Sequence, residues 1–245
     1  MVKIVQISDC HLFENPHKNG YNDINPADTL RKTLRKLVAH QPDLLMVTGD
    51  ISGDRSEASY LAFLHIVNDI LPDIPMRIVI GNHDNPDLVN SLLAEYVLHA
   101  GEPVTHGNWH IHGLNSFYQK AEGFVSHTQL EQVKALVLQH PNDFHMLAVH
   151  HHPLPTHSWM DKHAWINREA CLALIESTPQ IRGLMHGHIH ADKQARIAQC
   201  DIFAAPSTCW QFALTPSFAV TDESAGFRLF SLHPDGTLHT SVERI

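Results

Sequence analysis

Cysteine is scarce and scattered in this sequence of 245 residues. The four cysteines are Cys10, Cys171, Cys200 and Cys209. No two of them form a CxxC pair or a short secreted framework, so a disulfide scaffold is excluded. We therefore expect reduced thiols and a cytoplasmic location.

Long apolar runs are also missing. No stretch approaches 18 consecutive apolar residues, so we expect no membrane-spanning segment. The opening MVKIVQISD carries one lysine and then reads as a strand, without the apolar region and cleavage site of a signal peptide.

Positive charge is low relative to negative charge. Lysine and arginine number 17 against 26 acidic residues, a formal net charge of −9. Such a surface disfavours nonspecific phosphate contacts and attraction to anionic membranes, so we expect neither nucleic acid nor a membrane as partner. A share of 43% hydrophobic against 18% charged residues excludes a disordered chain. We expect one domain over residues 1–245 and leave the oligomeric state open.

Short apolar runs alternate with segments of helical spacing, which indicates an α/β fold. Asn25 and Pro26 together form a helix start signal, and Ser126 is another. Strands are predicted at 2–8, 43–48, 77–80, 109–114, 144–149 and 183–186. Helices are predicted at 26–38, 57–70, 86–99, 126–137 and 168–175. Residues 153–165 read as a polar connection, and residues 194–245 as short antiparallel strands without a helix.

Histidine is what the sequence has in excess, with 22 residues. Imidazole is the commonest metal ligand and the usual acid or base near neutral pH, so the count suggests a metalloenzyme. Taken singly, each histidine is more simply a surface residue without a role.

The polar residues directly after the predicted strands are the informative ones, because α/β folds place ligand sites there. Five strand ends carry a carboxylate, an imidazole or an amide oxygen. They are Asp9-Cys10-His11, Gly49-Asp50, Gly81-Asn82-His83-Asp84, His150-His151-His152 and His186-Gly187-His188-Ile189-His190.

This ligand set suits borderline divalent ions such as Mn, Fe, Co, Ni or Zn, and it is too large for one four-coordinate ion. Two ions sharing a carboxylate fit better. The spacing by two in Asp9-x-His11 and His188-x-His190 would put both side chains on one side of an extended segment. Glycines at 49, 81 and 187 would keep the backbone slim beside a crowded site.

Each motif alone has a simpler interpretation. Asp9-x-His11 could be a helix cap beside a surface histidine, Gly49-Asp50 a turn, and Gly81-Asn82-His83-Asp84 a hairpin or a cap. The order of all five motifs and their placement at strand ends favour a single site.

The whole series resembles the signature of the calcineurin-like metallophosphoesterases, over residues 9 to 190. The resemblance implies a four-layer α/β/β/α sandwich of two mixed sheets, the metallo-dependent phosphatase-like fold. It also implies two metal ions, as an Fe/Mn pair or two Mn.

The resemblance assigns a role to each matched residue. It implies that Asp50 bridges the two ions and that Asn82 and His83 bind the substrate phosphate. The catalytic residues would be His83 and Asp84, with Asp84 hydrogen-bonded to His83 and fixing its tautomer. One ion would be held by Asp9, His11, Asp50 and His190, and the other by Asp50, Asn82, His150 and His188. His151 is the fallback for His150.

A narrower likeness is to the bacterial class III 3′,5′-cyclic-AMP phosphodiesterases. It rests on residues 150–155, on Ser158-Trp159 with Asp161 and His163, and on residues 206–209 followed by Gln211-Phe212. A nucleobase would need an aromatic platform. Candidates are Trp159, Trp165, Trp210, Phe212 and His157, and the simpler alternative is that most of them belong to the core or to loops.

We therefore expect hydrolysis of 3′,5′-cyclic nucleotides such as cAMP to 5′-nucleoside monophosphates, by a hydroxide that bridges the two ions. His83 would protonate the leaving alkoxide or only stabilise charge. Two alternatives stay open. One is a broad-specificity metallophosphoesterase or nucleotidase, and the other is a non-catalytic metal-binding interaction module.

Overall fold

The computed structural model describes residues 1–245 and contains two large mixed sheets. The first has the order β13-β12-β1-β2-β3 and the second β4-β5-β6-β7-β9-β8. The strands of the first sheet are β1 (Val2–Ile7), β2 (Leu44–Val47), β3 (Met76–Ile78), β12 (Gly226–Leu232) and β13 (Leu238–Arg244). Those of the second are β4 (Val104–His106), β5 (Trp109–Leu114), β6 (Phe144–Val149), β7 (Ile181–His186), β8 (Lys193–Ile197) and β9 (Cys200–Ala204).

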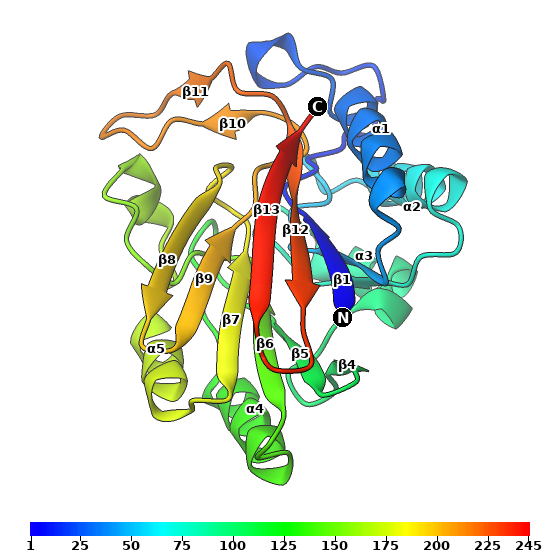
Figure 1. Ribbon diagram of the computed structural model, residues 1–245. Helices are drawn as coiled ribbons and strands as arrows, with labels where there is room; N and C mark the ends of the chain where they lie inside the picture. The colour runs from blue at the N-terminus through cyan, green and yellow to red at the C-terminus, as the bar shows by residue number, and fades with distance from the viewer.

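Five α-helices cover the outer faces of the two sheets, with α1, α2 and α3 beside the first sheet and α4 and α5 beside the second (Figure 1). Asn25 and Ser126 accept backbone N–H bonds as N-caps, which confirms both predicted start signals. The helices are α1 (Pro26–Leu37), α2 (Glu57–Ile70), α3 (Pro86–Leu92), α4 (His127–Gln139) and α5 (Arg168–Ser177).

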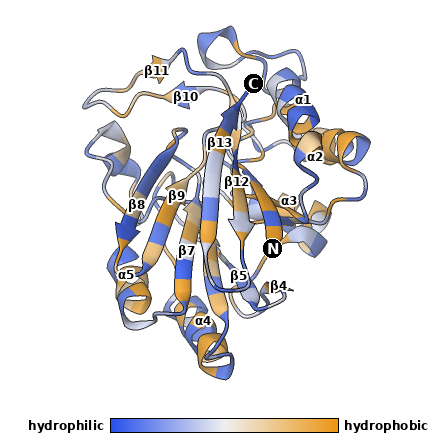
Figure 2. Ribbon diagram, viewed as in Figure 1, coloured by the Kyte–Doolittle hydropathy of each residue, from blue (hydrophilic) through white to orange (hydrophobic).

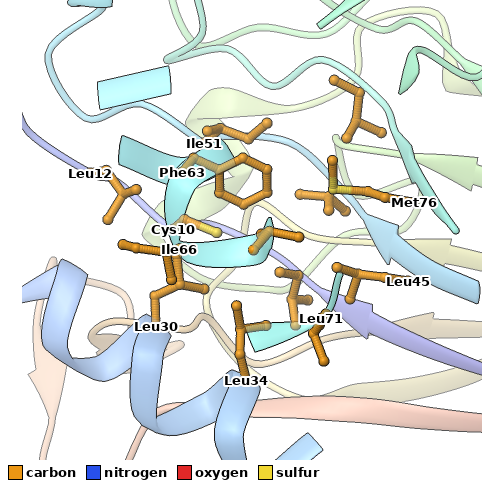
Figure 3. Packing of buried hydrophobic residues seen from close by; sticks show 14 of the residues in the cluster. Cys10, Leu12, Leu30, Leu34, Leu45, Ile51, Phe63, Ile66, Leu71 and Met76 are labelled. Atoms are coloured by element: carbon orange, nitrogen blue, oxygen red, sulfur yellow. The ribbon is translucent and has the colours of Figure 1, made fainter. Parts of the chain in front are cut away.

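Three apolar cores separate four layers, as the fold prediction requires. The first core lies between the first sheet and its helices and includes Leu34, Phe63 and Leu45 (Figure 3). The second joins the outer face of the second sheet to α4 and α5. The third lies between the sheets and brings Ile4 and Phe230 together with Met146. Strands buried on both faces have apolar side chains on both, as β1 shows in orange in Figure 2.

The helix predicted over residues 86–99 is too long. Helix α3 ends at Leu92, and a short 3-10 helix follows at Ala94–Tyr96. The chain then becomes extended, because the N–H of Leu98 donates to the carbonyl of Ile78 beside β3. Pairing with the sheet overrides the helical spacing of this segment.

The strand-rich tail is confirmed with one correction. Strands β12 and β13 are antiparallel and join β1 in the first sheet. A small hairpin of β10 (Gln211–Phe212) and β11 (Val220–Thr221) is antiparallel as well. Strand β9, however, pairs with β7 in parallel. The predicted connection 153–165 also contains a 3-10 helix at Trp159–His163. None of the helices has the length and apolar character needed to cross a bilayer.

Several histidines without an assigned role are buried, which corrects the simple expectation that they lie on the surface. His110, His112 and His145 are each at most 5% exposed. They alternate on β5 and β6 with residues of the core between the two sheets, so they face α4 and α5. Nδ1 of His112 lies 2.9 Å from the carbonyl of Ala100, and its Nε2 lies 2.8 Å from Nδ1 of His145.

Burial lowers the pKa of both His112 and His145 to about 4. In the unfolded chain an imidazole titrates near 6.5. Between these values the unfolded state binds protons that the folded state does not, so the free energy of unfolding should fall as pH falls from about 6.5 to 4. We expect the slope of the free energy of unfolding against pH to include the uptake of about one proton by each of the two histidines.

Chemical denaturation across this pH range measures that slope. In His145→Gln the slope should fall by about one proton, because glutamine does not titrate. His127→Gln is the matched control, since the side chain of His127 is 82% exposed. Equal slopes for wild type and His145→Gln would contradict the prediction.

Candidate metal centre

The five strand-end motifs meet at one edge of the two sheets. Asp9 follows β1, Asp50 follows β2, and Asn82 lies beyond β3; His150 follows β6, and His188 lies beyond β7. Strand β1 rises from the N-terminus in Figure 1, and the β10–β11 hairpin lies at that upper end. Carboxyl ends of parallel strands share an edge, so residues distant in sequence become neighbours.

The backbone at these residues is unusual. Five candidate ligands have positive φ values: 55° at Asp9, 47° at His11, 53° at Asp50, 71° at His188 and 45° at His190. Side chains other than glycine rarely adopt this left-handed conformation, and such residues cluster at functional sites. The extended geometry expected for Asp9-x-His11 and His188-x-His190 is therefore wrong. Alternate residues do converge, but through left-handed turns at the strand ends.

One group of donor atoms combines Asp9, His11 and His190. Nε2 of His190 lies 3.0 Å from Nε2 of His11 and 3.5 Å from Oδ1 of Asp9. All three side chains are buried. This group contains every ligand expected for the first ion except Asp50, the carboxylate expected to bridge the two ions.

A second group combines Asp50, His150 and His188, with Asn82 beside them. Nε2 of His150 lies 3.0 Å from Oδ1 of Asn82, 3.2 Å from Nδ1 of His188 and 3.4 Å from Oδ2 of Asp50. Oδ2 of Asp50 also lies 3.7 Å from Nε2 of His11, so this carboxylate stands between the two groups.

These separations fit two shared cations. Nitrogen and oxygen donors about 2.1 Å from one ion are about 3.0 to 3.4 Å apart in octahedral or tetrahedral coordination. Without a cation, the contact between the ring nitrogens of His11 and His190 needs a proton on one of the two, and a bound cation would replace that proton. The donor set therefore suits the two ions that the sequence predicted.

Backbone carbonyls fix the tautomers of three imidazoles. Nδ1 of His150 lies 2.7 Å from the carbonyl of Thr48, and Nδ1 of His190 lies 2.8 Å from that of Trp210. Nε2 of His188 lies 3.1 Å from the carbonyl of His163. Each ring can donate outward to a carbonyl and turns its other nitrogen inward to the other candidate ligands, the arrangement usual for metal-binding histidines.

The pKa values favour neutral imidazoles, with one exception. Burial holds the pKa of His11 and His188 well below the usual value and lowers that of His190 to about 3. Burial also acts on His150, but the charge of Asp50 outweighs it and raises the pKa to about 9. Burial of Asp50 is in turn outweighed by His150, so the Asp50 pKa stays low. Binding of a cation therefore displaces a proton from His150.

The glycines expected to leave room do so. A Cβ on Gly81 would overlap Asp50, and one on Gly187 would overlap the hydroxyl of Ser8. Gly49 has φ +90°, and a Cβ there would lie 2.6 Å from Nδ1 of His150. These backbone positions therefore approach the candidate ligands more closely than any side chain would permit.

Asp84 does not form the expected hydrogen bond to His83. Its carboxylate instead accepts the backbone N–H groups of Gly81 and Asp50, both at 2.9 Å, and that of Ser52 at 3.1 Å. The hydroxyl of Tyr60 donates to it at 3.3 Å. Burial and the charge of Asp50 raise the pKa of Asp84 to about 6. The carboxylate ties the loop after β2 to the loop after β3 and so positions the candidate ligands.

His83 is exposed at the rim of the two groups. Its backbone N–H donates to Oδ1 of Asp50 at 2.7 Å, and its ring lies edge-on to that of His11 with centroids 4.9 Å apart. Arg55, which the sequence analysis missed, donates to the carbonyls of Asn82 at 2.9 Å and His83 at 3.3 Å. No sequence signal separates Arg55 from an ordinary surface arginine.

A cleft of about 700 Å³ opens beside the two groups of donors. Of the predicted platform residues, Trp159, Trp210 and Phe212 line it. Tyr21 and Phe218 line it too and were missed. These rings contact one another, with centroids 5.1 Å apart for Trp159 and Phe212 and 5.3 Å for Tyr21 and Trp210.

Two predicted platform residues lie elsewhere. Trp165 is buried in the core beneath α4 and α5, and His157 lines a different cavity. Among the neighbouring histidines, His163 lines the cleft. His151, the fallback for His150, turns Nδ1 to the hydroxyl of Ser116 at 2.7 Å. His152 and His186 line the same separate cavity as His157.

Comparisons with known proteins agree on the family of folds. Residues 2–192 match the model of the calcineurin-like phosphoesterase family. A 3′,5′-cyclic adenosine monophosphate phosphodiesterase of Pseudomonas aeruginosa, CpdA, is 33% identical over all of this chain and 90% of its own. A 3′,5′-cyclic-nucleotide phosphodiesterase of Nostoc is 30% identical over 100% of this chain and 92% of its own.

Solved structures show the same fold at low identity. A dimetal phosphatase from Danio rerio has a TM-score of 0.68 at 15% identity, over 94% of both chains. A purple acid phosphatase from yellow lupin has a TM-score of 0.69 at 13% identity, over 99% of this chain and 51% of its own. The mixed two-sheet fold predicted from the sequence is confirmed.

The hydrogen bonds of Asp84 predict its contribution to stability. Asp84→Asn removes a buried charged acceptor of three backbone N–H groups, so the free energy of unfolding should fall by about 1.5–3 kcal/mol. Chemical denaturation in the presence of a chelator measures this without a contribution from bound ions. Asp69→Asn, an exposed carboxylate on α2, is the control and should change it by less than about 0.5 kcal/mol. A similar small change for both variants would contradict the assigned role.

Proposed function

The chain belongs to the calcineurin-like phosphoesterases, and from this premise we propose that it hydrolyses 3′,5′-cyclic nucleotides, cAMP among them, to 5′-nucleoside monophosphates. The observation that carries the proposal is the aromatic cleft that adjoins both groups of donors. It offers an apolar platform for a nucleobase within one continuous space with the reacting phosphate. Two relatives with similar lengths are named for this activity.

The proposed ligands of the ions are those that the structure groups. Asp9, His11 and His190 would hold one ion and Asn82, His150 and His188 the other, and Asp50 would contribute to both. An Fe/Mn pair or two Mn is proposed, since the nitrogen and oxygen donors suit both. When bound, two such ions lower the pKa of a water and neutralise the charged phosphoryl oxygens.

The side chains of this chain complete the reaction. Water oxygen forms a bond to phosphorus while the bond from phosphorus to the ribose 3′ oxygen breaks. A proton must reach that oxygen, because an alkoxide is a poor leaving group. His83 is placed to supply it, since its ring lies at the open rim, beside His11 and lining the cleft. The Asn82 amide lines the cleft at the same rim and contributes to binding of the phosphate.

The charge at the proposed site differs in sign from the net charge of the protein, so an anionic substrate can bind there. The buried carboxylates of Asp9, Asp50 and Asp84 carry formal charges of −3, whereas two divalent ions bring +4. Lys18 at the cleft wall adds a further positive charge above the ring of Phe13, 4.0 Å from its centroid.

A broad-specificity phosphoesterase is the second candidate. The cleft is wide and its rings Tyr21 and Phe218 are about half exposed, so nothing encloses the base on all sides. Fold and metal site do not fix the substrate. The Mn-loaded protein should be assayed in parallel on 3′,5′-cAMP, 2′,3′-cAMP and bis-p-nitrophenyl phosphate.

The proposal predicts the highest kcat/KM for 3′,5′-cAMP and a selective effect of the platform. Trp159→Ala should raise KM for 3′,5′-cAMP about 5- to 150-fold, the loss of a base–aromatic stack of about 1–3 kcal/mol. It should leave bis-p-nitrophenyl phosphate turnover within about twofold. Phe124→Ala, an exposed aromatic outside the cleft, is the control. Equal losses on both substrates would exclude a nucleobase platform at Trp159.

His83 should act on the reaction without holding the ions. His83→Ala should lower kcat about 10²- to 10⁴-fold, the range for a general acid, while the ion content per chain is unchanged. Asp50→Asn should lower both activity and ion content, because its carboxylate stands between the two groups. Element analysis after dialysis distinguishes them. Loss of ions from His83→Ala would show that His83 is a ligand.

A further inference from the structure

A second cluster of histidines lies at the opposite end of the second sheet from the cleft. His110 stands near the start of β5 and His145 near the start of β6, whereas the candidate ligands follow strand ends. His140 and Asp143 belong to the turn between α4 and β6, where the N–H of Asp143 donates to the carbonyl of His140 at 3.1 Å. The proposed phosphodiesterase reaction uses none of these side chains.

We propose that His110, His140 and Asp143 bind a further divalent cation of the zinc class, independently of the catalytic centre. Their ligand atoms all lie within 4.8 Å of one another. Nε2 of His110 lies 2.8 Å and Nδ1 of His140 lies 3.5 Å from Oδ2 of Asp143. Two imidazoles and one carboxylate with an open fourth position form a donor set that zinc takes in proteins.

The surroundings of His110 prepare it as a ligand. Nε2 of His110 hydrogen-bonds to Asp143, and the hydroxyl of Thr105 lies 3.0 Å from its Nδ1, so Nδ1–H can donate to Thr105 when a cation replaces the proton on Nε2. Such a partner on the second ring nitrogen fixes the tautomer and raises the basicity of a metal-binding histidine. The side chain of His110 is 7% exposed and is thus held in place.

The other two ligands leave an entry path for the ion. The side chains of His140 and Asp143 are 45% and 28% exposed. His140 follows the last turn of α4, and its N–H donates to the carbonyls of Leu136 and Val137. The carboxyl end of a helix carries partial negative charge, which favours a cation there.

An unpartnered nitrogen in the same cluster provides independent support. His145 stacks on His110 with centroids 4.9 Å apart, and its buried Nε2 has no hydrogen-bond partner. His145 thus places a buried imidazole nitrogen without a hydrogen-bond partner beside His110. Buried polar atoms without a partner are rare in proteins, and a bound water or ion is a usual explanation for them.

Zinc counting tests the proposal on the full chain. Equilibrium dialysis against Zn²⁺ followed by element analysis should give three ions for the wild type and two for His140→Ala and Asp143→Asn. In these variants the dissociation constant of the third ion should rise more than about 100-fold, since losing even an outer partner costs 10- to 100-fold. Turnover of phosphodiesters should stay within about twofold of the wild type.

Two further variants separate this site from zinc binding at surface histidines and from the catalytic centre. His127→Ala, a histidine 82% exposed on the same helix, should still bind three ions. Asp50→Asn should retain the distal ion although it loses catalytic ions, so the two proposals fail separately. Two ions in the wild type, three in His140→Ala, or an equal loss in His127→Ala would each overturn the distal site.

Discussion

The structure depends on a buried cluster of imidazoles and carboxylates that needs either protons or cations between its members. Ring nitrogens of His11 and His190 lie 3.0 Å apart, and Asp50 lies within 3.7 Å of both His11 and His150. Without protons or cations between them, such groups would repel or remain unpartnered in an apolar interior, at a cost of several kcal/mol. Two divalent ions would replace the shared protons, among them the one on His150.

The surrounding structure holds these imidazoles and carboxylates in place. Backbone carbonyls such as that of Thr48 orient the imidazoles, and the carboxylate of Asp84 binds backbone N–H groups of two loops. Left-handed residues at the strand ends direct alternate side chains to one point. Each of these conformations costs about 1–3 kcal/mol, and the rigid strands beneath the loops supply the support.

The aromatic lining of the cleft comes from different parts of the chain than the candidate metal ligands. Phe212 comes from the β10–β11 hairpin and Trp159 from the 3-10 helix after β6, whereas Tyr21 precedes α1. These loops meet over the donors and form an aromatic wall. Loops of this kind can change without disturbing the strand ends, so substrate choice can vary on a constant metal centre.

The sequence by itself determined the alternation of strands and helices, the strand-end position of the polar motifs and the family. Local periodicity and glycine spacing are short-range properties, and they survive without tertiary contacts. The cap at Asn25 belongs to this class. What the tertiary structure alone decided depends on contacts between distant segments. The end of α3 at Leu92 follows from pairing of Leu98 with Ile78, and the partners of Asp84 come from a loop 34 residues away. The aromatic wall and the distal histidine cluster likewise join segments far apart, and no spacing in the sequence records that His110 and His140 will meet.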